Sequence, residues 1–195
     1  MAGSTGGIAE GGAGKGADGG SSWSCPAGPF GSPIPSGATL TQVAGVPPPD
    51  PAGSIDQNGK GFSTIEGPVW VGDSLYVSEF PAGPTPPSRI IRITSAGIVS
   101  VVGPTGWDPG TNGLAVDIAG LLYGAVHEDG SVSSLDVTNG TRTPIVSNYP
   151  VGGPRFNSPN DLTIRSDGTI YFSDPNYQAP TVPPQSITGL YRVAP

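Results

Sequence analysis

Short apolar runs follow one another from residue 62 to the end of the chain, separated by turns rich in Gly, Pro, Asp and Asn. Runs of this length, bounded by such residues, are typical of β-strands. We find no convincing helix. The runs predict eleven strands: PVWV, SLYVSEF, RIIRITS, IVSVVG, LAVD, LLYGAVH, SVSSLDV, TPIVS, DLTIRS, TIYFSD and GLYRV.

The predicted strands form repeats. A tyrosine recurs in the second strand of each group at spacings of 47 and 48 residues: Tyr76, Tyr123 and Tyr171. A polar pair stands ahead of each group's first strand at spacings of 46 and 48 residues: Glu66-Gly67, Asn112-Gly113 and Asn160-Asp161. A period of about 40–50 residues with four strands per unit is typical of β-propeller blades. The competing fold is a β-sandwich of short strands, and the register between the repeats favours the propeller.

The chain is short for a closed propeller, which needs about four to eight blades. From Glu66 onward there is room for about three, and the third lacks its outer strand. We therefore expect residues 37–195 to form the N-terminal half of a β-propeller, with the C-terminal half missing. A strand at ATLTQVAG (38–45) fits this, because an N-terminal strand often completes the last blade.

Composition narrows the function further. With 32 Gly, 24 Pro and 12% charged residues, the chain is suited to turns and short strands. A net charge of -7 and only 8 Lys and Arg, without a basic run, exclude the electrostatic footprint of a nucleic-acid binder. One cysteine, Cys25, allows no internal disulfide. No stretch has the length of a membrane span.

The first 36 residues are a low-complexity, Gly-rich segment that we expect to be a disordered tail. The segment begins without the basic and apolar regions of a signal peptide, so none is expected in this chain. A Gly-rich tether of this kind is nevertheless typical of an exported bacterial protein, extracellular or periplasmic.

The polar pairs suggest a candidate site. The residue before each innermost strand lies at one mouth of a propeller's central channel, so Glu66, Asn112 and Asn160 are expected around one axis. A carboxylate and amide oxygens favour a divalent cation, above all calcium, whereas zinc would want His or Cys. Each pair also has a plain alternative as a turn or a local backbone cap.

Three segments resemble the SMP-30/gluconolactonase/LRE family: IEGPVW at 65–70, NGLAVD at 112–117 and NSPNDLTIRSDGTIYFSDPNY at 157–177. That family is similar in turn to the calcium-dependent paraoxonases and diisopropylfluorophosphatase. The resemblance implies a six-bladed propeller with a divalent metal, often calcium, in its channel, and many such proteins hydrolyse sugar lactones.

The resemblance also implies roles for individual residues. Glu66 matches the first metal ligand, and Asn160 matches an Asn that binds metal in some members and substrate or water in others. Asp161 corresponds to an Asp that helps to hold a second, structural calcium. Asn112 occupies a substrate-facing position, so Asn160 and Asn112 are the candidate catalytic residues. Further metal ligands of the family would lie beyond Pro195.

Four other residues attract smaller predictions. Arg155, in the loop before the third group, is a candidate for binding an anionic substrate. His127 is expected to be structural rather than catalytic. Asp174 is expected either to orient the channel Asn or to accept backbone hydrogen bonds. Trp70 is expected to pack between blades, as is Tyr171 of the repeated tyrosines.

Together these features predict a metal-dependent hydrolase of sugar lactones or related esters. The alternative is a non-catalytic propeller that binds protein or glycan through loops such as FPAGPTPPSR (80–89). A third possibility is an inactive, truncated chain that self-associates through its open blade edges.

Overall fold

The computed structural model describes residues 39, 64–81, 84 and 86–195. The chain divides into two units, Met1–Thr41 and Gln42–Pro195, and nearly all described residues belong to the second. The predicted tail at 1–36 and all but one residue of the predicted strand at 38–45 lie outside the described residues. The predicted domain boundaries therefore stay a prediction.

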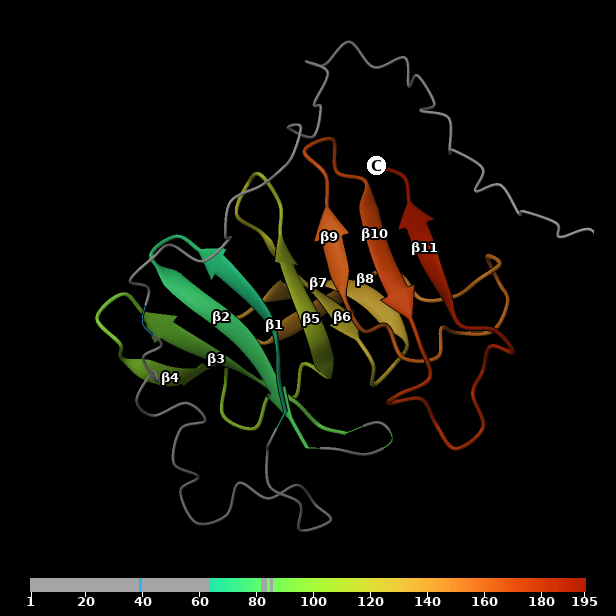
Figure 1. Cartoon of the computed structure of the whole chain (residues 1–195), viewed down its shortest axis with the longest axis horizontal. Helices are drawn as coiled ribbons and strands as arrows, with labels where there is room; N and C mark the ends of the chain where they lie inside the picture. Colours follow the sequence, from blue (N-terminus) through green and yellow to red (C-terminus); the bar gives the residue numbers. More distant parts are fainter. Residues whose placement is uncertain (1–38, 40–63, 82–83, 85) are drawn as a thin grey trace, which may run out of the picture. The chain divides into compact units, whose positions relative to one another are not determined.

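All regular structure in the described part of the chain is β, and the eleven predicted strands are confirmed (Figure 1). They form three antiparallel meanders in the order β1-β2-β3-β4, β5-β6-β7-β8 and β9-β10-β11. The strands are β1 (Thr64–Val71), β2 (Ser74–Phe80), β3 (Arg89–Thr94), β4 (Val99–Val102), β5 (Thr111–Val116), β6 (Leu122–Val126), β7 (Ser131–Asp136), β8 (Thr141–Val146), β9 (Leu162–Ile164), β10 (Ile170–Asp174) and β11 (Gly189–Val193). These meanders are the blades of an all-β, propeller-like fold, and we call them blades one, two and three.

The strand register confirms the repeat that the tyrosines predicted. Tyr76 pairs with Val69, Tyr123 with Ala115 and Tyr171 with Thr163. In each blade the tyrosine therefore faces the residue three positions after Glu66, Asn112 or Asn160. The three polar residues occupy one structural position, which we call the blade-start position.

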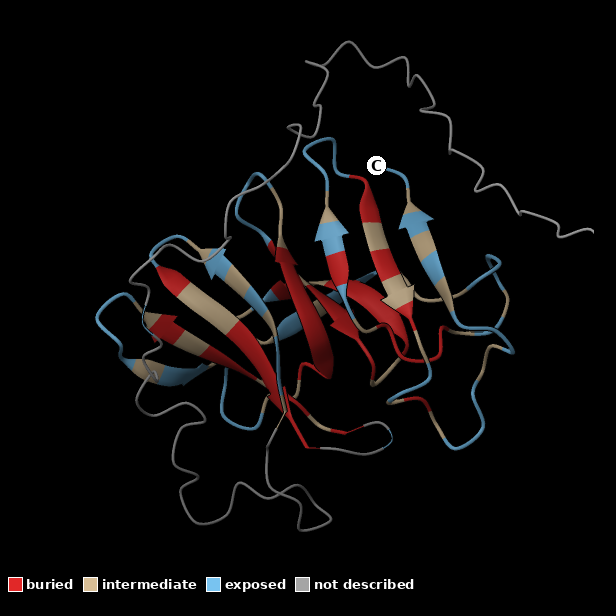
Figure 2. Ribbon diagram, in the orientation of Figure 1, coloured by how far each residue is buried: buried red, intermediate tan, exposed pale blue. Residues whose placement is uncertain are grey.

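Hydrophobic packing between successive blades holds them together. Leu114 and Leu122 of blade two share a cluster with Ile90 of blade one. Ala125 and Val132 share another with the third blade, in which Phe156 and Phe172 meet edge to face at 4.9 Å. Aromatic pairs in this geometry stabilise a core beyond the area they bury. Strand β5, flanked on both sides, is buried along most of its length (Figure 2).

The outer blades have open faces. Strand β1 alternates between exposed and half-buried residues, and Trp70 is 56% exposed. The prediction that Trp70 packs between blades is therefore wrong for the described residues, because more than half of its side-chain surface stays accessible. In the described segments no helix is long and apolar enough to cross a membrane.

Candidate channel site

The Asn112 position lies against the Glu66 position on one side and the Asn160 position on the other, and glycines make this approach possible. A Cβ at Gly67 would stand 2.4 Å from the Leu114 nitrogen, and one at Gly113 would stand 2.7 Å from the Asn160 oxygen. No real Cβ comes so close to backbone atoms. The Gly113 N–H also donates a 2.6 Å hydrogen bond to the Asn160 carbonyl. The structure thus brings the middle position into contact with both others.

The turn alternatives fail for two of the three pairs. Glu66-Gly67 lies within β1 and Asn112-Gly113 within β5, each at an irregularity in the ladder with the next strand. A β-bulge of this kind often re-aims a side chain beside a functional site. Asp161 does cap locally, because its Oδ1 accepts a 2.9 Å hydrogen bond from the Leu162 N–H.

Asn112 is more enclosed than a substrate-facing residue is expected to be. It is 2% exposed, although β5 borders the candidate channel. Its Nδ2 donates a 3.3 Å hydrogen bond to Oε1 of Gln178, which lies on the connection between β10 and β11. Gln178 itself is partly exposed.

A buried carboxylate organises the approach to Asn160. Asp174, at the end of β10, accepts hydrogen bonds from the N–H groups of Asn157 (2.9 Å) and Ser158 (2.8 Å). Burial raises the pKa of this carboxyl, while the two backbone donors act in the opposite direction. Of the two roles predicted for Asp174, the backbone acceptor is confirmed. Because Asn160 is two residues from Ser158, the hydrogen bond between Asp174 and Ser158 also helps to fix the location of Asn160.

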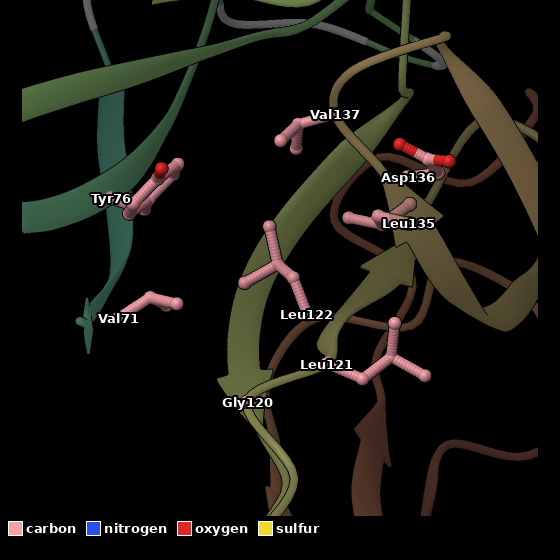
Figure 3. Close-up of a pocket in the computed structure, with 8 residues that line it drawn as sticks. All are labelled: Val71, Tyr76, Gly120, Leu121, Leu122, Leu135, Asp136 and Val137. Carbon is pink, nitrogen blue, oxygen red and sulfur yellow. The ribbon is translucent and has the colours of Figure 1, made fainter.

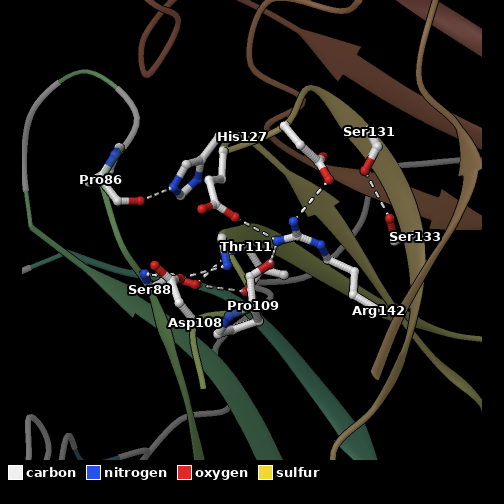
Figure 4. A network of polar contacts seen from close by, with 12 residues as sticks. Pro86, Ser88, Asp108, Pro109, Thr111, His127, Ser131, Ser133 and Arg142 are labelled. Carbon is white, nitrogen blue, oxygen red and sulfur yellow. Dashed lines mark hydrogen bonds and ion pairs between the residues drawn. The ribbon is translucent and has the colours of Figure 1, made fainter. Parts of the chain in front are cut away.

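Buried hydroxyls join blade one to the residue before Asn112 (Figure 4). Ser78, the β2 partner of Glu66, contacts the Thr111 hydroxyl at 2.8 Å. The Thr111 N–H donates to Ser88 Oγ at 2.7 Å, and the Ser88 N–H donates to Asp108 Oδ1 at 2.8 Å. Burial raises the pKa of Asp108. This chain of contacts fixes the Glu66 position relative to the Asn112 position.

His127 is buried and structural, as predicted. Its Nε2 lies 2.6 Å from the Pro86 carbonyl oxygen, and its ring meets Phe80 edge to face at 5.3 Å. Burial lowers the pKa of His127 to about 4, so the imidazole is neutral near pH 7 and Nε2 carries the proton donated to Pro86.

Arg155 is engaged with backbone rather than pointing to open solvent. Its Nη1 donates to the Glu128 carbonyl at 2.9 Å, and its Nε donates to the Phe156 carbonyl at 3.3 Å. These contacts tie the β6–β7 turn to the segment leading into blade three. They favour a structural role, and substrate binding by Arg155 stays a prediction.

The oxygen ligands at the blade-start positions are of the type that a hard cation prefers, but they are few. Glu66 supplies a carboxylate, Asn160 an amide and Asp161 a second carboxylate, whereas calcium takes about six to eight oxygens. Glu66 and Asp161 are exposed and Asn160 is half-buried. Within the part of the chain that the structure describes, no group of three His, Cys, Asp or Glu residues is placed to hold a metal.

Among the described residues, one pocket lies away from the blade-start positions. It has a volume of about 220 Å³ and sits between blades one and two, where Val71, Tyr76, Leu121 and Leu135 line it (Figure 3). Val71 is the last residue of β1, whereas Glu66 lies near its start, so this pocket is at the opposite end of β1 from the blade-start position. The residues that line this pocket are mainly apolar, and we interpret the pocket as a packing gap between the two blades.

Comparison with known proteins agrees with this architecture. A gluconolactonase from Zymomonas mobilis is 32% identical over 149 residues, covering 67% of this chain and 40% of that protein. A solved gluconolactonase from Xanthomonas campestris, described as important in glucose secondary metabolic pathways, matches with a TM-score of 0.54 and 29% identity, over 67% of this chain and 44% of its own. No family model matches the chain.

A second solved structure, described as a candidate gluconolactonase, shows the fold alone. Its TM-score is 0.59 at 21% identity, covering 83% of this chain and 51% of its own. The described part of the chain is thus a set of propeller-like blades, and the chain spans 40–51% of the length of these relatives. The resemblance to the SMP-30/gluconolactonase-like family is confirmed.

Sequence patterns missed several residues that shape the site. Gln178 lies in a Pro-rich stretch, NYQAP, without strand periodicity. Ser78 and Thr111 are ordinary polar residues in strands, and their contact spans 33 positions. Asp174 did carry a signal, since it stands directly before a proline near the end of the third family-like segment.

Proposed function

We propose that this protein is a divalent-metal-dependent hydrolase of sugar lactones or related esters, with calcium as the metal. The proposal rests on one observation: close approaches at Gly67 and Gly113 bring the backbone of the Asn112 position against that of the Glu66 and Asn160 positions, in a chain that is 32% identical to a gluconolactonase. The positions are 46 and 48 residues apart in sequence.

The proposed reaction adds water to the lactone carbonyl. The water oxygen bonds to the carbonyl carbon, the ring C–O bond breaks, and the leaving ring oxygen takes a proton, giving a hydroxy acid. A bound cation would polarise the carbonyl and favour ionisation of a bound water.

The chain's own residues would prepare this step. Glu66 would bind the cation, and Asp161 would contribute to a second, structural calcium. Asn160 and Asn112 would orient water and substrate by hydrogen bonding. Because these residues sit on or beside inner strands, their positions are set before substrate arrives, which is the condition for electrostatic preorganisation.

The test compares Glu66→Gln with a charge-matched control, Asp73→Asn, in the exposed β1–β2 hairpin at the other end of β1. Calcium affinity is measured by calorimetry, and hydrolysis of glucono-1,5-lactone is followed in a pH-stat with calcium and after chelation. We expect Glu66→Gln to lose calcium affinity and turnover, and Asp73→Asn to keep both. Turnover that survives chelation, or is unchanged in Glu66→Gln, contradicts the proposal.

We further propose that the 195-residue chain self-associates through its open blade edges. Among the described strands, β11 pairs only with β10, and Leu190 on it is 75% exposed. A strand with an unpaired edge is a template for pairing with another chain. Beside it lies a groove of about 580 Å³, lined among others by the exposed side chains of Ile187 and Leu190.

A further inference from the structure

Gln178 is a candidate for the substrate-facing role that the sequence analysis assigned to Asn112. The Asn112 side chain is enclosed, at 2% exposure, and its Nδ2 donates to Gln178 Oε1. A ligand in the channel cannot reach a group so well covered without moving the residue over it. Gln178 is partly exposed, so part of its side chain stays accessible to a ligand.

The backbone of Gln178 is anchored to blade three. Its N–H donates to Ser158 Oγ at 3.3 Å, and the Ser158 hydroxyl donates to the Pro175 carbonyl at 2.8 Å. Ser158 is fully buried and its own N–H is held by Asp174. Gln178 is thus fixed at one end by the turn that leads to Asn160 and at the other by Asn112.

We propose that Gln178, rather than Asn112, is the ligand-facing amide of the candidate site, and that Asn112 is its positioning residue. The amide oxygen of Gln178 is occupied by Asn112, so the Nε2 group is left to donate hydrogen bonds. An oxygen-rich ring, such as a sugar lactone with its hydroxyl groups, supplies acceptors for such a donor. This inference rests on the proposed function, because it assigns a substrate contact at the same site.

The test uses the whole 195-residue chain labelled with ¹⁵N, and D-glucose as a six-membered sugar ring that cannot hydrolyse, in the presence of calcium. Side-chain amide signals of Gln178 and Asn112 are followed during titration. We expect glucose to shift the Gln178 signals more than those of Asn112.

Two variants separate positioning from ligand contact. Gln178→Glu keeps an acceptor for Asn112 Nδ2 and loses the outward donor, whereas Gln178→Leu loses both. Both are expected to weaken glucose binding about tenfold, the loss of roughly one hydrogen bond, but only Gln178→Leu should change the Asn112 amide signals. Gln185→Leu is the matched control, since Gln185 lies on the same connection and donates to the Tyr149 and Pro154 carbonyls instead.

Each outcome is decisive. If glucose shifts Asn112 and Gln178→Leu binds as tightly as wild type, Asn112 contacts the ligand and the inference is wrong. If the chain binds no glucose, the inference also fails, and the separate lactone assay judges the proposed function. If glucose binds with the expected Gln178 pattern but no lactone is hydrolysed, the inference stands and the proposed function falls.

Discussion

Replacing Gly113 by alanine tests whether close approach of the blades defines the candidate site. The added Cβ would lie 2.7 Å from the Asn160 oxygen, 2.7 Å from Asp161 Cα and 2.8 Å from Asp161 Oδ1. Two of these atoms are backbone, so no side-chain rotation relieves the clash. Overpacking costs about 1–3 kcal/mol, and separating the strands also weakens the Gly113–Asn160 hydrogen bond, worth about 0.5–1.5 kcal/mol. We expect Gly113→Ala to lower the free energy of unfolding by about 2–4 kcal/mol.

The assay is urea unfolding followed by tryptophan fluorescence, with Gly120→Ala as the control. Gly120 has a φ of +83° and nothing within 4 Å of its added Cβ, so its substitution carries backbone strain without a clash. That strain costs about 1–2 kcal/mol. Equal stability of Gly113→Ala and wild type, or a smaller loss than in Gly120→Ala, would refute the reasoning that blade contact is tight here.

Two further predictions concern acid stability and association. The pKa of His127 is lowered from 6.5 to about 4, so the unfolded chain gains a proton first and stability is lost as pH falls from about 6.5 to 4; the full effect is about 3 kcal/mol. Urea titrations across this pH range should show a falling free energy of unfolding. The raised pKa values of Asp108 and Asp174 act in the opposite direction and reduce the fall. A free energy that does not change with pH, and is the same in His127→Gln as in wild type, contradicts the prediction. Sedimentation velocity of the 195-residue chain should show concentration-dependent association through the open blade edges, and a compact monomer at all concentrations would rule this out.

The blade-start residues show which features of the candidate site could be predicted from the sequence. Glu66, Asn112 and Asn160 were aligned by spacing alone, and the pairing of the tyrosines confirms that register. Spacing could not reveal that Asn112 is covered, because the covering residue, Gln178, comes from another blade. It also could not show that Arg155 is occupied by carbonyls of the neighbouring blade.

The sequence by itself determined the strands, their turns and the length of the repeat, because apolar alternation and turn residues act over a few positions. Tertiary structure alone decided which side chains meet. The Gly67–Leu114 and Gly113–Asn160 approaches, the Ser78–Thr111 contact and the enclosure of Asn112 all join residues from different blades. Such contacts depend on how sheets pack face to face, and the packing geometry is not encoded in any local pattern of residues.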